Sequence, residues 1–292
     1  MKQIAIIGLG LIGGSLTKAL KAKGYKVIGI DKSSKTIQLA LKEKVINNGY
    51  TKFNSKSLEN IDLIFICTPL HLITDYLTKL SKVKLKNGVI ITDVGSTKSE
   101  ICKHANKVFT THHCFIGSHP MAGTEKTGFI SSKKNLFKNC AWVLTPTYKN
   151  NQLLTVIKTI IKKTGAKPIL TTPKKHDEAI ALISHLPLLT SVGLCEITKD
   201  SNMKDFASKL VSSGFRDITR IASGNPAMNS NLLISNSLIL KQVLPIYLKK
   251  LNNILKMART KSKSLHKKLR TVSIWRSKLY NLKGENNLLL KP

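Results

Sequence analysis

The chain has 292 residues, of which 42% are hydrophobic, and its formal net charge is +33. This length allows one large domain or two ordinary ones, each with a buried core. The five cysteines show no CxxC spacing, so we expect no metal site, and reduced thiols in the cytoplasm or an equivalent reducing compartment. The basic residues are spread along the chain with few aromatics, and no long uncharged apolar segment occurs, so neither nucleic-acid binding nor a membrane span is expected.

Short apolar runs alternate with helical patterns through the first half of the chain. The apolar runs occupy residues 4–7, 27–30, 61–67, 88–93 and 115–117. Alternating strands and helices of this size predict an α/β fold with a doubly wound parallel sheet that carries helices on both faces.

The pattern changes after about residue 145. One more helix and one short strand are expected at residues 150–163 and 166–171, and only helical spacing follows. Candidate helices are residues 176–195, 203–212, 227–238 and 240–264. We therefore expect a first domain at residues 1–148 and an all-helical domain at residues 149–292. Its apolar helices favour dimerisation, and the chain after Lys256 forms a basic tail.

A glycine-rich loop follows the first apolar run and opens the first helix. Gly8 permits a tight turn, Gly10 lets a pyrophosphate approach the backbone, and Gly13 lets helix and strand pack closely. The free backbone N–H groups of the first helical turn, which begins at Leu11 and Ile12, favour phosphate binding. The sequence therefore predicts a Rossmann-type domain that binds a dinucleotide.

Two further features complete the predicted cofactor site. Asp31 ends the second apolar run, where a carboxylate accepts hydrogen bonds from the ribose of NAD and repels the 2′-phosphate of NADP. NAD is therefore favoured, although the neighbouring Lys32 and Lys35 leave NADP open. Thr68 and Pro69 follow the third apolar run, at the strand end where open α/β sheets bind ligands.

Residues 92–98 and 117–126 follow two later strands and should lie on the cofactor side of the sheet. Hydride transfer from an alcohol requires a group that takes the hydroxyl proton, and histidine suits this role because its pKa lies near the working pH. His119 is the best-placed candidate for this base. Ser96 could form a hydrogen bond to the same hydroxyl or to the imidazole.

The helical half contains Arg216 and Arg220, which share a face if they lie on one helix. Guanidinium groups suit carboxylates. On spacing alone, a substrate site and a solvated basic face remain equally open for this pair.

These motifs together resemble the prephenate/arogenate dehydrogenase family of tyrosine biosynthesis. The matching stretches are GLGLIGGS (8–15), TDVGSTK (92–98), GSHPMAGTEKTG (117–128), HDEAIALISHLP (176–187) and GFRDITRIASGNP (214–226). The resemblance implies a Rossmann domain followed by a helical dimerisation domain, and therefore a homodimer. It also implies oxidative decarboxylation of a cyclohexadienyl dicarboxylate, with hydride transfer to a nicotinamide.

The resemblance also implies roles for particular residues. His119 would accept the proton of the ring hydroxyl, with Ser96 beside the nicotinamide and the substrate. Arg220 matches the arginine that binds the ring carboxylate, and Arg216 is a second candidate for a substrate carboxylate. His185 and Glu125 match residues of the family that line or close the substrate pocket.

Two positions depart from the family pattern. Asn229 stands where the family has an aromatic residue, and Leu188 differs from many prephenate-type members. Where they read S-H-L-P-H, this chain has Leu188 in place of the second histidine. An apolar residue removes one hydrogen-bond donor for the keto-acid end of prephenate, so the resemblance favours arogenate.

Two alternatives remain. A β-hydroxyacid dehydrogenase of the 6-phosphogluconate type shares the two-domain plan but requires a catalytic lysine on the first long helix of the second domain. Lys174 and Lys175 are available there without a matching motif. The basic tail, residues 256–283, could instead bind nucleic acid or a membrane surface, with Trp275 and Tyr280 as stacking groups.

Overall fold

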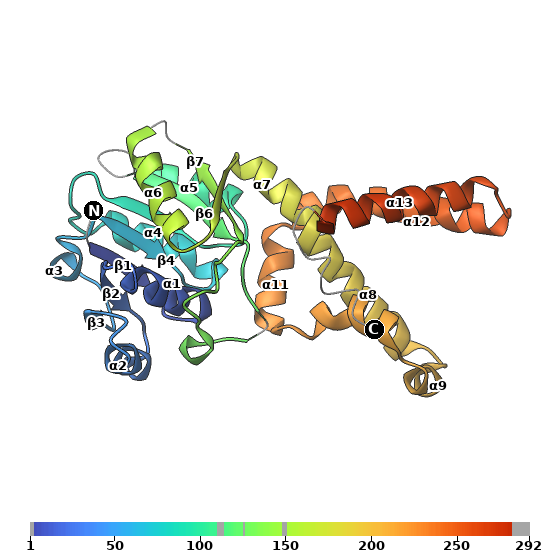
Figure 1. Ribbon diagram of the computed structural model, residues 1–292, viewed down its shortest axis with the longest axis horizontal. Coiled ribbons are helices and arrows are strands. Elements are labelled where there is room, and N and C mark those ends of the chain that lie inside the picture. The colour runs from blue at the N-terminus through green and yellow to red at the C-terminus, as the bar shows by residue number, and fades with distance from the viewer. Residues whose placement is uncertain (1–2, 110–113, 125, 148–150, 282–292) are drawn as a thin grey trace. The chain divides into compact units, whose positions relative to one another are not determined.

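The computed structural model describes residues 3–109, 114–124, 126–147 and 151–281 (Figure 1). The chain divides into two compact units, Met1–Leu240 and Lys241–Pro292. The larger unit contains a β-sheet with its covering helices and a set of further helices, and the smaller unit is helical.

An eight-stranded sheet with the order β3-β2-β1-β4-β5-β6-β7-β8 forms the centre of the larger unit. Its strands are β1 (Gln3–Ile7), β2 (Lys26–Ile30), β3 (Asn48–Tyr50), β4 (Leu63–Ile66), β5 (Ile90–Asp93), β6 (Cys114–Pro120), β7 (Ala141–Pro146) and β8 (Lys167–Leu170). Strands β1 to β6 pair in parallel, as expected for a doubly wound sheet, which confirms the predicted fold class. Strand β7 departs from the all-parallel expectation because it runs antiparallel to β6.

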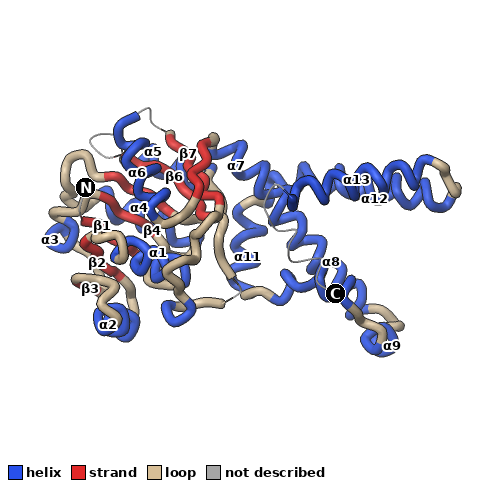
Figure 2. The backbone as a smooth tube through the Cα atoms, in the orientation of Figure 1, coloured by secondary structure: helices blue, strands red, loops and turns tan. Residues whose placement is uncertain are grey.

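Helices cover both faces of the sheet (Figure 2). They are α1 (Leu11–Lys21), α2 (Ser34–Lys42), α3 (Ser55–Leu58), α4 (Ile73–Ser81), α5 (Ser99–Val108) and α6 (Asn151–Lys163), with short 3₁₀ turns η1 (Leu70–Leu72) and η2 (Phe129–Ser131). Side chains alternate along each strand, so Ile4 and Ile6 pack with α1 and α6, whereas Ala5 and Ile7 pack with α4 and α5. Burial on both faces explains why these strands read as continuous apolar runs.

A nearly continuous helical run follows β8. It consists of α7 (Pro173–Ile180), the π-helical turn η3 (Ala181–His185) and α8 (Leu186–Asp200). The expected helix 176–195 lies inside this run. Pro187 has no N–H to donate to the preceding turn, and the wider π turn directly before it accommodates that loss.

Shorter helices complete the larger unit. They are α9 (Lys204–Lys209), α10 (Ser213–Thr219), the 3₁₀ turn η4 (Arg220–Ser223) and α11 (Pro226–Ser235). Helix α12 (Ser237–Arg259) begins in this unit and continues into the smaller one. The division expected near residue 148 stays a prediction, and strand β8 lies beyond it within the same sheet.

The smaller unit contains most of α12 and also α13 (Ser264–Asn281). Helix α13 lies within the basic tail, for which the sequence pattern predicts no helix. Many of its apolar side chains are exposed, including Leu269, Val272 and Trp275.

One helix of the described chain, Pro173–Asp200, is long and apolar enough to cross a membrane by length and composition alone, and the bent pair α11 and α12 would count as a second. Core helices of water-soluble proteins have the same length and hydropathy. Three polar side chains of Pro173–Asp200, those of His176, Asp177 and His185, are buried within the fold and form hydrogen bonds there. These contacts attach the helix to the rest of the larger unit, and 33% of its most apolar window is buried.

Candidate active site

The loop between β1 and α1 has the geometry of a phosphate-binding turn. Gly8 has a φ of +93°, and a Cβ atom there would lie 2.7 Å from the carbonyl oxygen of Cys67. A Cβ atom at Gly13 would lie 1.8 Å from the carbonyl oxygen of Gly8, so only glycine lets the helix start this close to the loop. A Cβ atom at Gly10 would meet nothing within 4 Å, which leaves open space beside the backbone.

Asp31 lies beside this loop, as expected for the end of β2. Its carboxylate accepts hydrogen bonds from the backbone N–H of Leu9 at 2.8 Å and of Ser33 at 2.9 Å. Leu11 and Ile12, the first residues of α1, are half-buried, and the N–H groups of this first turn have no partner within the helix. The structure thus brings the predicted residues of the loop and Asp31 together.

Thr68 and Pro69 follow β4 next to the same loop, because Gly8 contacts the backbone of Cys67 and Thr68. The hydroxyl oxygen of Thr68 is buried and has no hydrogen-bond partner in the described protein. A buried polar atom without a partner is costly and indicates a site that a ligand completes. Pro69 is exposed.

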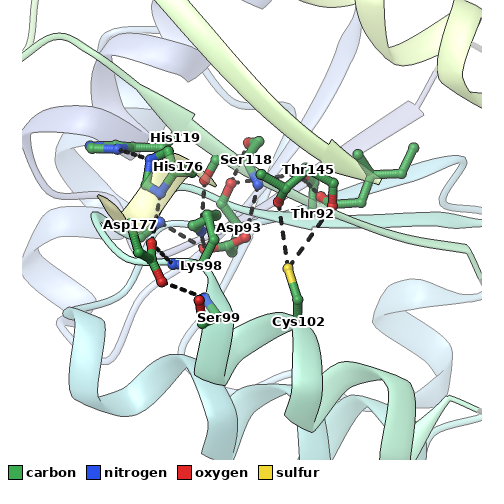
Figure 3. A network of polar contacts seen from close by, with 12 residues as sticks. Thr92, Asp93, Lys98, Ser99, Cys102, Ser118, His119, Thr145, His176 and Asp177 are labelled. Atoms are coloured by element: carbon green, nitrogen blue, oxygen red, sulfur yellow. Dashed lines mark hydrogen bonds and ion pairs between the residues drawn. The ribbon is translucent and has the colours of Figure 1, made fainter. Parts of the chain in front are cut away.

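A buried ion pair lies at the carboxyl end of β5 (Figure 3). The ammonium group of Lys98 contacts the carboxylate of Asp93 and donates a hydrogen bond to the carbonyl oxygen of Ser118 at 2.8 Å. The same carboxylate accepts the backbone N–H groups of Gly95 at 2.8 Å and of Ser118 at 3.1 Å. These contacts fix the loop that carries the half-buried Ser96 against strand β6.

His119 lies inside β6, opposite Val143 of the antiparallel strand β7, and not in a loop after a shorter strand. Its Nδ1 atom is 2.9 Å from Nε2 of His176, and Nδ1 of His176 is 2.7 Å from Oδ1 of Asp177 (Figure 3). Asp177 also accepts the backbone N–H of Lys98. The Nδ1 atom of the candidate base, His119, is therefore held by His176 at the start of α7.

A second buried histidine lies on the π turn η3. Nδ1 of His185 is 3.0 Å from Nδ2 of Asn236, which also donates to the carbonyl oxygen of Asp177 at 2.9 Å. His185 is fully buried, yet its Nε2 atom has no partner among the described residues. Like the hydroxyl of Thr68, this atom is available to a ligand.

Burial disfavours the charged form of both histidines. It lowers the pKa of His185 to about 4, with Asp177 acting in the opposite direction. Burial also lowers the pKa of His119 well below its usual range, and unfavourable electrostatic interactions with the basic side chains of His176, Lys98 and His185 add to this effect against the attraction of Asp177. Neutral imidazoles are the forms that can accept or relay a proton at neutral pH.

The predicted arginines are not joined to this network by any described contact. Arg216 on α10 is exposed and pairs with Asp217 at 3.0 Å. Arg220 is exposed and begins the 3₁₀ turn η4, so the two residues do not share one regular α-helix. Both segments pack against α8. Glu125 lies outside the described residues.

Five residues of the network were not among the predicted site residues: Asp93, Lys98, His176, Asp177 and Asn236. The first four stand inside stretches that carry the family resemblance, so the signal was present without a role attached to it. For Asn236 the sequence offers no such signal. Among the residues described, no group of three or more His, Cys, Asp or Glu could hold a metal ion.

The sheet order and the glycine loop define the class of a dinucleotide-binding α/β protein. Comparison with sequence models of protein families gives two adjoining matches. Residues 16–170 match the nucleotide-binding domain of prephenate dehydrogenase, and residues 172–271 match its dimerization domain. The chain belongs to the prephenate dehydrogenase family, which confirms the resemblance.

Individual relatives agree with this assignment. The chain is 37% identical to a prephenate dehydrogenase of Bacillus subtilis over 237 residues, which span 80% of this chain and only 64% of that enzyme. A crystal structure of Synechocystis arogenate dehydrogenase is similar with a TM-score of 0.86 and 33% identity, covering 95% of this chain and 99% of that one. Prephenate dehydrogenase of Aquifex aeolicus, in complex with hydroxyphenyl propionate and NAD⁺, gives a TM-score of 0.86 at 28% identity, covering 96% and 98%.

The low pKa of His185 predicts a pH dependence of stability. The unfolded chain binds a proton at this residue near pH 6.5, whereas the folded protein binds it only near pH 4, so the unfolded state binds more protons between these values. The free energy of unfolding should therefore fall as the pH drops from about 6.5 to about 4. In urea titrations across this range, His185→Gln should lose part of the fall. The exposed His71→Gln serves as the matched control, and equal pH dependence in both variants would contradict the assignment.

Proposed function

We propose that this protein oxidatively decarboxylates arogenate or prephenate with hydride transfer to a nicotinamide cofactor, giving tyrosine or 4-hydroxyphenylpyruvate. The observation that carries this proposal is the arrangement of His119. Its Nδ1 atom is held by His176, which leaves Nε2 as the only ring atom that can act on a substrate. Family membership supplies the class of reaction, and the dinucleotide loop supplies the cofactor class.

In this mechanism His119 accepts the proton of the ring hydroxyl at Nε2. A bound nicotinamide supplies the hydride acceptor. Ser96 is proposed to orient the hydroxyl, because its loop is fixed beside β6 by the pair Asp93 and Lys98. Loss of CO₂ from the oxidised ring makes it aromatic, so the reaction proceeds in one direction.

The described residues fit a dinucleotide. The open space at Gly10 admits a pyrophosphate, and the unpartnered hydroxyl of Thr68 offers a hydrogen bond. We propose NAD as the cofactor, because the similar Aquifex aeolicus enzyme was crystallised with NAD⁺. Asp31 supports this choice, because a carboxylate has enough lone pairs to accept ribose hydroxyls in addition to its two backbone contacts. The exposed Lys32 and Lys35 leave NADP as the other candidate.

Within the two substrates we propose arogenate. Leu188 is buried on α8, directly after the π turn, and offers no donor to a keto-acid side chain. The relatives include both arogenate and prephenate dehydrogenases, so the choice rests on this residue. Arg220 is proposed to bind the ring carboxylate, with Arg216 as the second candidate, and His185 and Glu125 to line or close the pocket.

The alternative of a β-hydroxyacid dehydrogenase is less supported, because both family matches are to prephenate dehydrogenase. The first helix of the helical half also supports a different role. The residues that reach the network from α7 are His176 and Asp177, whereas Lys174 is exposed and pairs weakly with Glu178.

The first test combines arogenate or prephenate with NAD or NADP and follows the absorbance of the reduced cofactor. Arogenate with NAD should give the highest kcat/KM, and His119→Asn should lower kcat by about 10²–10⁴-fold because the general base is lost. A higher kcat/KM with NADP than with NAD would contradict the proposal that Asp31 selects NAD. A higher kcat/KM with prephenate than with arogenate would contradict the proposal that Leu188 favours arogenate. Absence of turnover with all four pairs, from folded protein that binds dinucleotide, would overturn the proposed function.

Arg220 is tested in the same assay. A guanidinium that pairs with a substrate carboxylate contributes about 2–5 kcal/mol when the pair is desolvated, and Arg220 lies at the lower end because it is exposed without substrate. Arg220→Ala should therefore raise KM more than tenfold. Arg270→Ala, a matched substitution on the exposed surface of α13, should leave KM unchanged. Equal KM values for the two variants would exclude Arg220 from the substrate site.

We also propose a homodimer formed through the helical half. The matched family region is described as a dimerization domain. Large apolar side chains are exposed on its helices: Ile197, Phe206, Leu210, Ile218 and Ile234. Burial of such side chains stabilises an interface. Light scattering after gel filtration should give twice the chain mass of 32.3 kDa, and a mass of one chain would contradict this proposal.

The compartment is proposed to be the cytoplasm or an equivalent reducing one. The described cysteines, Cys67, Cys102, Cys140 and Cys195, are free thiols, and burial raises the pKa of Cys102 to about 11, which makes it unreactive. No function in binding nucleic acid or membranes is proposed for the basic tail. Recovery of the native protein in the membrane fraction of its cells would contradict this assignment.

A further inference from the structure

Asp177 is linked to two further histidines, each through one intermediate residue. Its side chain contacts His176, which contacts His119, and its main-chain carbonyl contacts Asn236, which contacts His185. We propose that Asp177 is a positioning residue that sets opposite tautomers in His119 and His185. His119 then presents a bare Nε2 and His185 presents an Nε2–H group. The use of these two atoms rests on the proposed function, but the tautomers themselves do not.

The side chain of Asp177 is fixed as a hydrogen-bond acceptor. Its Oδ1 accepts the backbone N–H of Lys98 at 2.7 Å, and its Oδ2 accepts that of Ser99 at 2.8 Å. Burial raises the pKa of Asp177, but hydrogen bonds from His176, Ser99 and Lys98 outweigh this effect and keep it below the usual value. An ionised carboxylate can only accept. Nδ1 of His176, at 2.7 Å from Oδ1, must therefore carry the hydrogen.

The direction of the hydrogen bond between His176 and Asp177 determines the direction of the one between His176 and His119. A neutral imidazole with a hydrogen on Nδ1 has a lone pair on Nε2. The proposal takes His176 as this neutral form, in which Nε2 of His176 accepts and Nδ1 of His119, 2.9 Å away, donates. The hydrogen of neutral His119 is then on Nδ1, and its Nε2 atom has the lone pair that a general base requires.

The main chain of Asp177 sets the other histidine. Its carbonyl oxygen can only accept, so the side-chain atom of Asn236 at 2.9 Å must be the NH₂ group. The same NH₂ group lies 3.0 Å from Nδ1 of His185, which must therefore accept. The hydrogen of neutral His185 is then on Nε2, the buried atom that has no partner in the described protein.

The two histidines thus offer complementary groups to a ligand. His119 offers an acceptor for a hydroxyl proton, and His185 offers a fixed donor for an anionic or carbonyl oxygen. A buried donor without a protein acceptor is unfavourable relative to a satisfied one, so a ligand oxygen that accepts from it gains binding free energy. Asn236 is the second positioning residue of this arrangement.

The tautomers can be measured directly by NMR. Full-length protein labelled with ¹⁵N-histidine is recorded at pH 8 without substrate in long-range ¹H–¹⁵N spectra, where the two ring nitrogens have distinct shifts. Signals are assigned by their loss in His119→Gln and His185→Gln. His119 should be the Nδ1–H form and His185 the Nε2–H form. The opposite tautomer in either residue, or an imidazolium in either, would overturn the proposal.

Two variants separate positioning from a general structural role. Asn236→Ala should give His185 a mixture of both tautomers while His119 stays in its Nδ1–H form. Asn231→Ala is the matched control. Asn231 lies on α11, the helix that Asn236 caps, and its side-chain nitrogen is 3.1 Å from Nδ1 of the exposed His71, which is the same kind of contact. It should alter only the signals of His71. Unchanged His185 signals in Asn236→Ala would contradict the proposal.

Asp177→Asn tests whether the side chain of Asp177 sets the tautomer of His119 through His176. The amide cannot accept from His176, Lys98 and Ser99 together, so His119 should show both tautomers if the variant folds. If it does not fold, the wild-type tautomers and Asn236→Ala still decide the question. Predicted tautomers without turnover would leave this inference standing and overturn the proposed function. Turnover with the opposite tautomers would do the reverse.

Discussion

The buried ion pair between Asp93 and Lys98 is the contact on which the rest of the site depends. Two charges removed from water are costly unless each is also hydrogen-bonded, and here both are. Asp93 accepts two backbone N–H groups, and Lys98 donates to the carbonyl oxygen of Ser118. The pair therefore binds the loop after β5 to strand β6, next to His119. The backbone N–H of Lys98 in turn holds Asp177, so the helical half is tied to the sheet at the same point.

The sheet and the glycine loop were predictable because they depend on local sequence. Gly8, Gly10 and Gly13 have a spacing that follows from the turn itself, and Asp31 follows from the end of the next strand. Strand β3 was not predicted, because its three residues are mostly exposed and polar and give no apolar run. The antiparallel direction of β7 also leaves no mark on an apolar run, since direction depends on the connection and not on the strand.

The contacts that orient the histidines could not be predicted in the same way. His119 and His176 are 57 positions apart, and Asp177 and Asn236 are 59 positions apart, so no spacing rule relates them. The arginines show how such a spacing rule depends on the element. Arg216 and Arg220 would share a face on one regular helix, but η4 begins at Arg220 with 3₁₀ geometry, and no described contact joins either residue to the network. A local rule holds only while the element stays regular.

The π turn η3 changes the directions in which the two histidines of the long helical run point. A regular α-helix turns about 100° per residue, so His176 and His185, nine positions apart, would point to nearly opposite sides. A single π turn absorbs one residue and reduces their separation to roughly 80°. Both histidines can then serve one site from a single helix. The widened turn acts as a one-residue insertion that rotates the second histidine, so the proposed site depends on helical phase as much as on residue identity.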